Sequence, residues 1–259
     1  MEAVLYKIEN GVAIVTLNRP ERYNAVNQDI IEGLNDAFNK VKNDKNVRCI
    51  VINGSGRGFC AGADMTVFGD DATPEQRSDY IIETYQPLIN KFTQLNKPII
   101  GAINGSAAGV GASFALACDF RVMGHSSSIY FAFINIAIGP DGGGSWLLAR
   151  QVGYSKALEI ATSGKKISGE DCYKLGLTNK LVEDDKILEE AINWAQELAK
   201  KPTLAIGITK EDMMFSINNS LHDTIAFEAK KQITAFKSQD HIEGVTAFVE
   251  KRMPNFKGK

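Results

Sequence analysis

Residues 97–111, KPIIGAINGSAAGVG, decide the fold expected for this chain. The first half is an apolar run typical of a buried strand, and the second half is a glycine-rich turn. Small and apolar residues then continue to Cys118 and favour a helix. The order strand, glycine-rich turn, helix is typical of an α/β unit whose turn follows the end of the strand.

The same order occurs earlier in the chain. Residues 47–52 are rich in β-branched side chains, which predicts a buried strand, and they run into a glycine-rich loop, GSGRGFCAGAD, at 54–64. Residues 4–8 and 12–17 flank Asn10-Gly11, a strong hairpin signal, and residues 28–41 carry apolar side chains at helical spacing. This alternation, up to about residue 182, predicts an α/β core with a largely parallel sheet.

The remaining segments complete the expected layout. Short strands are predicted at 120–123, 129–133 and 179–182, with helices elsewhere beyond Trp146. Residues 65–80, which include Asp70 and Asp71, are the least apolar part, and we expect a mobile surface segment there. We divide the chain into a core, 1–195, and an amphipathic helical region, 196–259, whose apolar faces can cover the core or another subunit.

Composition excludes several classes of protein. The 259 residues include 29 basic and 31 acidic side chains, so the chain lacks the basic surplus usual in a nucleic-acid binder. No apolar run is long enough to span a membrane, and the first residues do not resemble a secretion signal. Four cysteines without a C-x-x-C pair indicate free thiols in a reducing, cytoplasmic location, and three scattered histidines predict no metal site.

The glycine-rich segments admit several interpretations. Residues 109–114 begin like a dinucleotide-binding fingerprint but lack its acidic partner, and residues 54–58 lack the Lys-Ser/Thr of a phosphate loop. Ser113 is one residue short of a serine-hydrolase elbow, and it equally suits the buried face of a helix. Each segment alone is most simply a tight turn. Two such loops after strands, however, leave the N–H groups of Ala63 and Val110 free to stabilise an oxyanion.

Three segments together resemble a known family. Residues 59–64, residues 97–111 and Pro140-Asp141-Gly142-Gly143 are similar to the signature segments of the crotonase (enoyl-CoA hydratase/isomerase) superfamily, and the resemblance covers nearly the whole chain. It implies a crotonase-like spiral of ββα units with a C-terminal helical region that forms trimers and hexamers. It also implies acyl-CoA substrates, no cofactor beyond the coenzyme A of the substrate, and an oxyanion hole made by Ala63 and Val110.

The resemblance also places the coenzyme A groove. The stretches 22–26 and 61–65 would line it, through Arg22, Ala25, Val26, Ala61, Ala63, Asp64 and Met65. Arg22, Arg57 or a C-terminal lysine of a neighbouring subunit would meet the phosphates, although exposed basic residues are often simply solvated. We interpret Asp64 as a structural residue that closes the oxyanion loop.

The departures from the family pattern bear on the reaction. Hydratases that resemble this chain carry two glutamates, at the positions where this sequence has Ser113 and Phe133. One carboxylate remains, Asp141, and the family's isomerases keep a single Asp or Glu at that position. Its neighbours Ile136, Ile138, Phe131, Phe133 and Trp146 predict desolvation and a raised pKa. The alternative is that Asp141 caps the helix that begins near Gly144.

The resemblance therefore implies an acyl-CoA isomerase with Asp141 as its single acid and base. It would move a double bond from Δ3 to Δ2, as in fatty acid metabolism, or isomerise a ring-epoxide thioester, as in phenylacetate catabolism. Phe131, Phe133 and Trp146 would form the acyl pocket. Two alternatives stay open: a hydratase with non-standard residues, and a non-catalytic or RNA-associated protein of the same fold.

Overall fold

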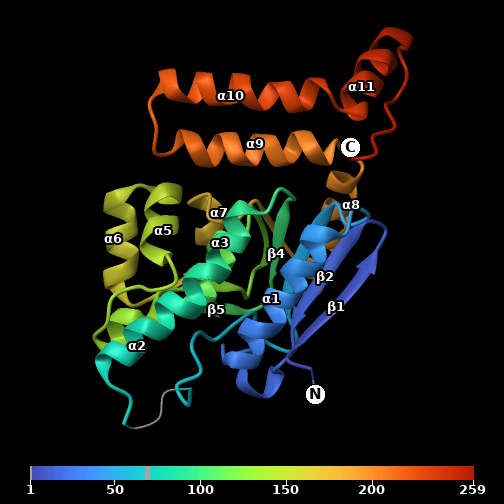
Figure 1. Ribbon diagram of the computed structural model, residues 1–259. Helices are drawn as coiled ribbons and strands as arrows, with labels where there is room; N and C mark the ends of the chain where they lie inside the picture. Colours follow the sequence, from blue (N-terminus) through green and yellow to red (C-terminus); the bar gives the residue numbers. More distant parts are fainter. Residues whose placement is uncertain (1, 68–70) are drawn as a thin grey trace.

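The computed structural model describes residues 2–67 and 71–259, which form two sheets and the helices around them (Figure 1). The larger sheet has the strand order β1-β2-β3-β4-β6-β9, and the smaller one has the order β5-β7-β8. In the larger sheet only β1 and β2 are antiparallel. Its strands span Val4–Glu9, Val12–Leu17, Cys49–Gly54, Ile99–Ile103, Phe120–Gly124 and Lys180–Val182.

The central strands are apolar on both faces because helices cover both. In β2, Ala13 and Val15 face the core cluster that includes α1 (Gln28–Asn43), whereas Val12 and Ile14 pack with α8 (Ile187–Ala199). Such double coverage is usual for parallel sheets. The expected α/β core with a largely parallel sheet is thereby confirmed.

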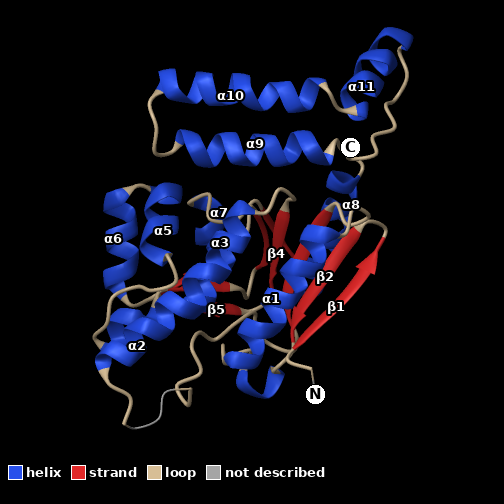
Figure 2. Ribbon diagram, in the orientation of Figure 1, coloured by secondary structure: helices blue, strands red, loops and turns tan. Residues whose placement is uncertain are grey.

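The other helices surround the two sheets (Figure 2). In chain order they are α2 (Pro74–Tyr80), α3 (Gln86–Gln94), α4 (Val110–Ala117), α5 (Gly144–Val152), α6 (Tyr154–Ser163), α7 (Gly169–Lys174), α9 (Thr203–Ser216), α10 (Leu221–Phe236) and α11 (Gln239–Glu250). The segment between α2 and α3, Ile81–Tyr85, continues the helix with π-type bonding. Helix α4 is buried along its whole length, which explains its run of small and apolar residues.

The expectation of a mobile segment over residues 65–80 is wrong for its second half, which is helix α2. The side chain of Thr73 accepts a hydrogen bond from the Gln76 N–H, and the Gln76 side chain bonds the Thr73 N–H in return. This capping box, followed by Pro74 in the first turn, starts a helix without apolar content. Asp70 lies outside the described residues.

The smaller sheet also differs from the expectation. Its strands are β5 (Ser106–Ala108), β7 (Ser128–Tyr130) and β8 (Lys166–Ser168). The sequence predicts a turn for the first, a strand reaching residue 133 for the second, and no strand at all for the third. Three-residue strands carry too little periodicity to be recognised, since their pairing with distant partners defines them.

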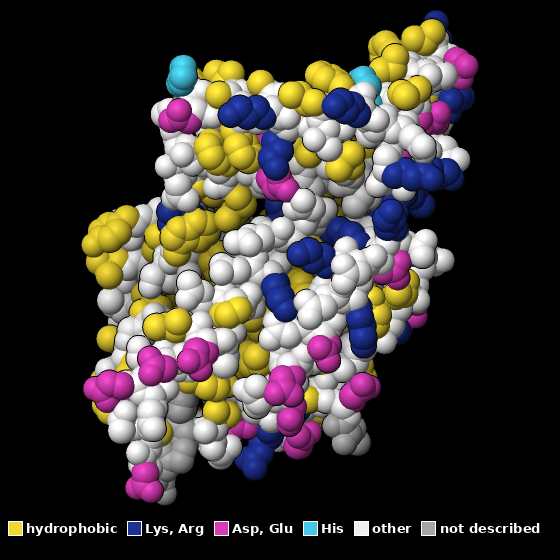
Figure 3. Space-filling model, in the orientation of Figure 1, with side chains coloured by type: hydrophobic (Ala, Val, Ile, Leu, Met, Phe, Trp, Pro, Cys, Tyr) yellow, Lys and Arg dark blue, Asp and Glu magenta, His cyan; other side chains and the backbone are white. Residues whose placement is uncertain are grey.

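Helices α9, α10 and α11 lie together over one end of the core, and they begin after α8 (Figure 1). The boundary expected after residue 195 falls inside α8, whose last alanines belong to the core. Apolar side chains are spread over these helices (Figure 3). The exposed ones include Met213, Leu221, Ile225, Ile233, Phe236, Ile242, Phe248 and Val249, and Met253, just after α11, is exposed too.

The described residues settle two smaller points. All four cysteines are buried and free, as expected. Within residues 2–67 and 71–259, no helix combines the length and the apolar character that crossing a membrane requires.

Candidate active site

The glycine-rich loops that follow β3 and β4 contact each other through their backbones. The Ala108 N–H donates to the Cys60 carbonyl oxygen at 2.8 Å and ties the loops together. At Gly62, with φ of +102°, a Cβ would lie 3.0 Å from the Ala108 oxygen, and at Gly109, with φ of +53°, it would lie 3.6 Å from the Gly62 Cα. Glycine is needed at both positions because the backbones touch and φ is positive.

The residues that follow these glycines are the two predicted oxyanion-hole donors. The neighbours of Ala63 bond to Val26, through Val26 N–H to Gly62 oxygen at 2.7 Å and Asp64 N–H to Val26 oxygen at 2.9 Å. In such a parallel bridge the intervening Ala63 N–H points away from the partner strand. Val110 is the first residue of α4, so its N–H has no acceptor within the helix and lies at the positive end of the helix dipole.

The loop that carries Asp141 sits on the first turns of α4. The Ser113 hydroxyl donates to the Asp141 carbonyl oxygen at 2.9 Å. A Cβ on Gly142 would lie 2.9 Å from the Val110 Cγ2 atom, so this loop is in contact with the residue whose N–H is the second predicted donor. The structure thus brings Ala63, Val110 and Asp141 together from three separate loops.

Within the described part of the chain, the Asp141 carboxylate lacks a hydrogen-bond partner at one of its two oxygen atoms. Its Oδ1 atom is buried and has no hydrogen-bond partner among the described residues. Desolvation by burial raises its pKa to about 6, which agrees in direction with the expectation. The alternative role as a helix cap is wrong, because the N-cap of α5 is Gly143 and no side chain caps it.

The surroundings of Asp141 differ from the expected ones. Ile136 and Ile138 are 60% and 48% exposed, so they do not shield Asp141 from solvent. Phe131 is fully buried beside Gly144, and Phe133 is buried beside Gly109. Tyr85, which no sequence pattern singles out, is a further titratable neighbour. Burial raises the pKa of its hydroxyl, with further contributions from Tyr80 and from the Asp141 charge.

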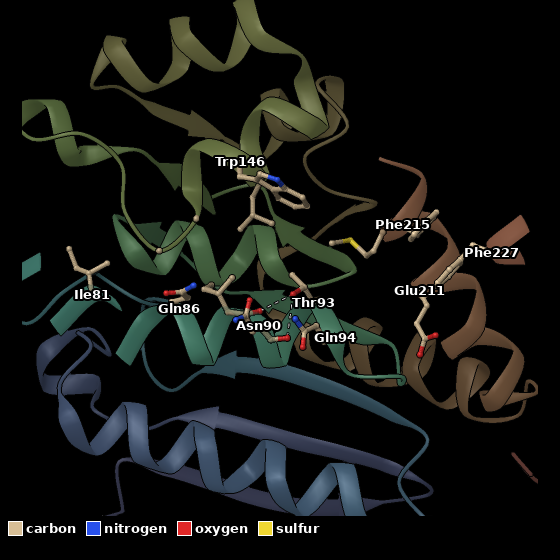
Figure 4. A pocket seen from close by; sticks show the side chains of 14 residues that line it. Ile81, Gln86, Asn90, Thr93, Gln94, Trp146, Glu211, Phe215 and Phe227 are labelled. Carbon is tan, nitrogen blue, oxygen red and sulfur yellow. Dashed lines mark hydrogen bonds between the residues drawn. The ribbon is translucent and has the colours of Figure 1, made fainter. Parts of the chain in front are cut away.

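A cavity of about 690 Å³ adjoins the loop that carries Asp141, although Asp141 itself is not in its lining (Figure 4). It begins at Gly142 and Gly143 and extends between α3, α5, α9 and α10. Of the three aromatic residues expected in an acyl pocket, Trp146 lines this cavity. Phe131 and Phe133 are not in its lining and belong to the core. A cavity of this size suits a small-molecule acyl group.

The cavity wall formed by α3 was not anticipated from the sequence. It presents Gln86, Asn90, Thr93 and Gln94. Three of them recur at every fourth residue, which places them on one helix face. The four-residue spacing can be seen in the sequence. Only the packing of α9 and α10 shows that this helix face lines a cavity.

The two stretches expected to line a coenzyme A groove lie side by side. The Ala61 N–H donates to the Tyr23 carbonyl oxygen at 2.9 Å, and Val26 bonds to both neighbours of Ala63. Their side chains divide into three sets by exposure. Val26 and Asp64 are buried, Ala25 and Ala63 are partly exposed, and Arg22, Ala61 and Met65 are exposed.

Asp64 is anchored on all sides. Its carboxylate pairs with Arg19 at 2.9 Å and accepts from the Thr66 hydroxyl at 2.7 Å. The Thr66 hydroxyl and N–H, together with Arg19, hold its pKa below the usual range. Among the basic residues proposed for the phosphates, Arg57 is engaged with Tyr23, whose hydroxyl it bonds at 3.1 Å. Arg22 has no ion pair in the described part of the chain.

Comparison with known proteins places this arrangement in a family. Residues 7–259 match the family model described as enoyl-CoA hydratase/isomerase. The chain belongs to the enoyl-CoA hydratase/isomerase family. It has the crotonase fold and is an acyl-CoA hydratase/isomerase of that superfamily.

Some relatives of this chain are named isomerases and others are named hydratases. The chain is 37% identical to the 1,2-epoxyphenylacetyl-CoA isomerase of Escherichia coli K12, over the full length of both. It is 34% identical to a mitochondrial enoyl-CoA hydratase of Pongo abelii, over 96% of this chain and 84% of that one. The crystal structure of a Bacillus anthracis enoyl-CoA hydratase matches with a TM-score of 0.94 and 30% identity, over 99% of this chain and all of that one.

Proposed function

We propose that the protein is an acyl-CoA isomerase in which Asp141 is the single acid and base. It moves a double bond from Δ3 to Δ2 or isomerises a ring-epoxide thioester. The observation that carries the proposal is one half-buried carboxylate, whose buried Oδ1 atom has no partner among the described residues, together with the absence of carboxylates at the hydratase positions. Ser113 is fully buried and bonds the Asp141 backbone, and Phe133 is an apolar core residue.

The reaction needs one proton carrier. In a 3-enoyl thioester the C2–H bond is acidified by both the carbonyl and the alkene. The Asp141 carboxylate takes a C2 proton, and the C–H electron pair moves to the thioester carbonyl oxygen, which gives a dienolate conjugated with the C3–C4 double bond. The protonated Asp141 then returns the proton to C4, which leaves the double bond between C2 and C3. Nothing is gained or lost overall.

The N–H groups of Ala63 and Val110 stabilise the negative thioester oxygen. Each such donor contributes a factor of about 10²–10³ to the rate. A base with a pKa near 6 is ionised at neutral pH and still basic enough to compete for the C2 proton. Burial therefore suits Asp141 to this task better than it would suit an exposed aspartate with a pKa of about 3.9.

Two ultraviolet assays on the purified protein test the proposal. Conversion of 3-hexenoyl-CoA to the conjugated 2-enoyl thioester raises the absorbance, whereas hydration of crotonyl-CoA lowers it. We expect activity in the first assay and little in the second. Strong hydration of crotonyl-CoA with negligible isomerisation would contradict the proposal.

Hydration with non-standard residues is the second candidate, and the hydratase names of several relatives favour it. The weakness of this candidate is that adding water requires a group to orient and deprotonate the water in addition to Asp141. A non-catalytic or RNA-associated role is the third. The formal charge of −2 argues against it, and steeply salt-dependent RNA binding would support it.

We further propose that the protein assembles as a homotrimer or a dimer of trimers. The exposed apolar side chains of α10 and α11, among them Ile233, Phe236 and Phe248, support an interface there. Mass measurement by light scattering tests this proposal, and a monomer at micromolar concentration would contradict it.

A further inference from the structure

The cavity beside Asp141 has two chemically different walls. One wall is apolar, with Trp146 and Leu147 from α5, Met214 and Phe215 from α9, and Phe227 from α10. The facing wall is α3, which presents three amides and a hydroxyl beside the apolar Ile89 (Figure 4). An acyl chain that enters from Gly142 therefore meets hydrogen-bonding groups on one side along its length.

The amides on α3 are free to bind a ligand. No described residue makes a hydrogen bond to the side chains of Gln86, Asn90 or Gln94, whereas Thr93 is bonded to the Ile89 carbonyl oxygen at 3.2 Å. Water satisfies such exposed amides in the empty cavity. A plain hydrocarbon chain would displace that water and leave the amides unpaired, which costs free energy. A chain that carries its own oxygen atom would replace the lost hydrogen bonds.

The charges around the cavity select a neutral oxygen group. The charged side chain in the lining is Glu211, and Lys231 pairs with it. An adjoining hollow is lined by Lys42, Lys91 and Lys97. Of these, Lys91 is bonded to Asn39, and Lys97 to the carbonyl oxygens at 41 and 44. The charge in the lining is thus compensated, and a terminal carboxylate would find no cation among the lining residues to replace its lost solvation.

We propose that the acyl group of the substrate carries a neutral oxygen function, such as a hydroxyl or a ketone, that Asn90 and Gln94 bind. This inference rests on the isomerase function proposed above and specifies its substrate class. Asn90 and Gln94 lie one helical turn apart, so one oxygen atom of the substrate can accept hydrogen bonds from both amides. A hydroxyl can also donate a hydrogen bond to an amide oxygen. They are specificity residues, and Asp141 remains the proton carrier.

A matched set of thioesters tests the proposal. It consists of 3-octenoyl-CoA with a hydroxyl at C6, C7 or C8, each paired with its methyl isostere, and the mono-CoA thioester of 3-octenedioic acid. Isomerisation is followed by ultraviolet absorbance. We expect kcat/KM for one hydroxyl compound to exceed that of its methyl isostere about tenfold, the effect of one or two neutral hydrogen bonds.

Variants locate the effect on α3. Asn90→Leu and Gln94→Met replace the amides by apolar groups of similar size. We expect each to lower kcat/KM for the hydroxyl compound and to raise it for the methyl isostere, which abolishes the preference. Asn193→Leu is the matched control, since Asn193 is an exposed residue of α8 outside the cavity. It should keep the wild-type preference.

The outcomes separate the two proposals. If the methyl isosteres or the dicarboxylic thioester are isomerised better than the hydroxyl compounds, the inference is wrong and the isomerase function stands. If no thioester is isomerised, the Δ3-to-Δ2 isomerase function is wrong, and dissociation constants for the saturated hydroxyl and methyl acyl-CoAs then decide the inference. Equal binding of both, or an unchanged preference in Asn90→Leu, would overturn it.

Discussion

Asp64 and Asp141 lie in two loops of the same site and have opposite surroundings. Asp64 is paired with Arg19 and bonded by Thr66, and its pKa is held low. Asp141 is half-buried, its buried Oδ1 atom has no hydrogen-bond partner among the described residues, and desolvation raises its pKa to about 6. The comparison teaches that a carboxylate in a family motif is structural or reactive according to how its charge is solvated.

The contrast also extends to the loops that carry them. The Asp64 loop is tied to residue 26 and to β5 by backbone hydrogen bonds, so the aspartate completes a rigid structure. The Asp141 loop is held through its backbone by Ser113, which leaves the carboxylate itself free for substrate.

The largest effect is expected from Asp141→Asn. An amide cannot carry the proton, so kcat/KM for 3-hexenoyl-CoA should fall by a factor of about 10²–10⁴. The ultraviolet isomerisation assay measures it, with Asp64→Asn as the matched control. Near wild-type turnover of Asp141→Asn on every CoA substrate would show that Asp141 is not the proton carrier.

The next largest effect is expected from Gly62→Ala, which acts on the oxyanion loop. The added Cβ lies 3.0 Å from the Ala108 oxygen and shifts the adjoining N–H of Ala63. Loss of one donor should lower kcat by a factor of about 10²–10³. Gly176→Ala is the control, because Gly176 also has positive φ but no atom within 4 Å of an added Cβ. Equal activity of the two variants would contradict the assignment of Ala63.

A pH profile separates the two aspartates. The base must be ionised, so kcat/KM should be constant above about pH 6 and fall about tenfold per pH unit below it, following the raised pKa of Asp141. The lowered pKa of Asp64 adds no inflection in that range. A profile that stays flat down to pH 4.5 would exclude Asp141 as the base.

The smallest effect on the rate is expected from Asp64→Asn. This variant loses the pair with Arg19, so the free energy of unfolding should fall by about 1–3 kcal/mol. Because the folded pKa of Asp64 is lowered, the difference should be present above the unfolded pKa of about 3.9 and vanish as the pH falls through the folded value. Urea unfolding at two pH values measures it, with kcat expected to stay within about threefold of wild type. A thousandfold loss of kcat would instead make Asp64 catalytic.

The sequence predicts those features of the molecule that depend on local signals. The hairpin of β1 and β2, the helices α1 and α4 and the two glycine loops follow from turn chemistry and periodicity. The start of α2 was also encoded, in the capping box of Thr73 and Gln76, but the absence of apolar residues obscured it. Only pairing with distant partners could define β8.

The site was predictable in its backbone and less so in its walls. Glycine spacing points to the N–H groups of Ala63 and Val110, because the signal is local. The exposure of Ile136 and Ile138, and the position of Phe131 behind Gly144, depend on packing that no local pattern contains. The amides of α3 became a cavity wall only through the placement of α9 and α10.

One measurement tests the contrast between the two aspartates most directly: the free energy of unfolding of wild type and Asp141→Asn at pH 4 and pH 7. Because the folded pKa of Asp141 is raised, its carboxylate costs stability as the pH rises from about 4 to about 6, by about 1–3 kcal/mol at pH 7. We predict that the inactive Asp141→Asn is more stable than wild type at pH 7 and that the gain shrinks at pH 4. A variant that is less stable than wild type at pH 7 would show that Asp141 is a structural residue like Asp64.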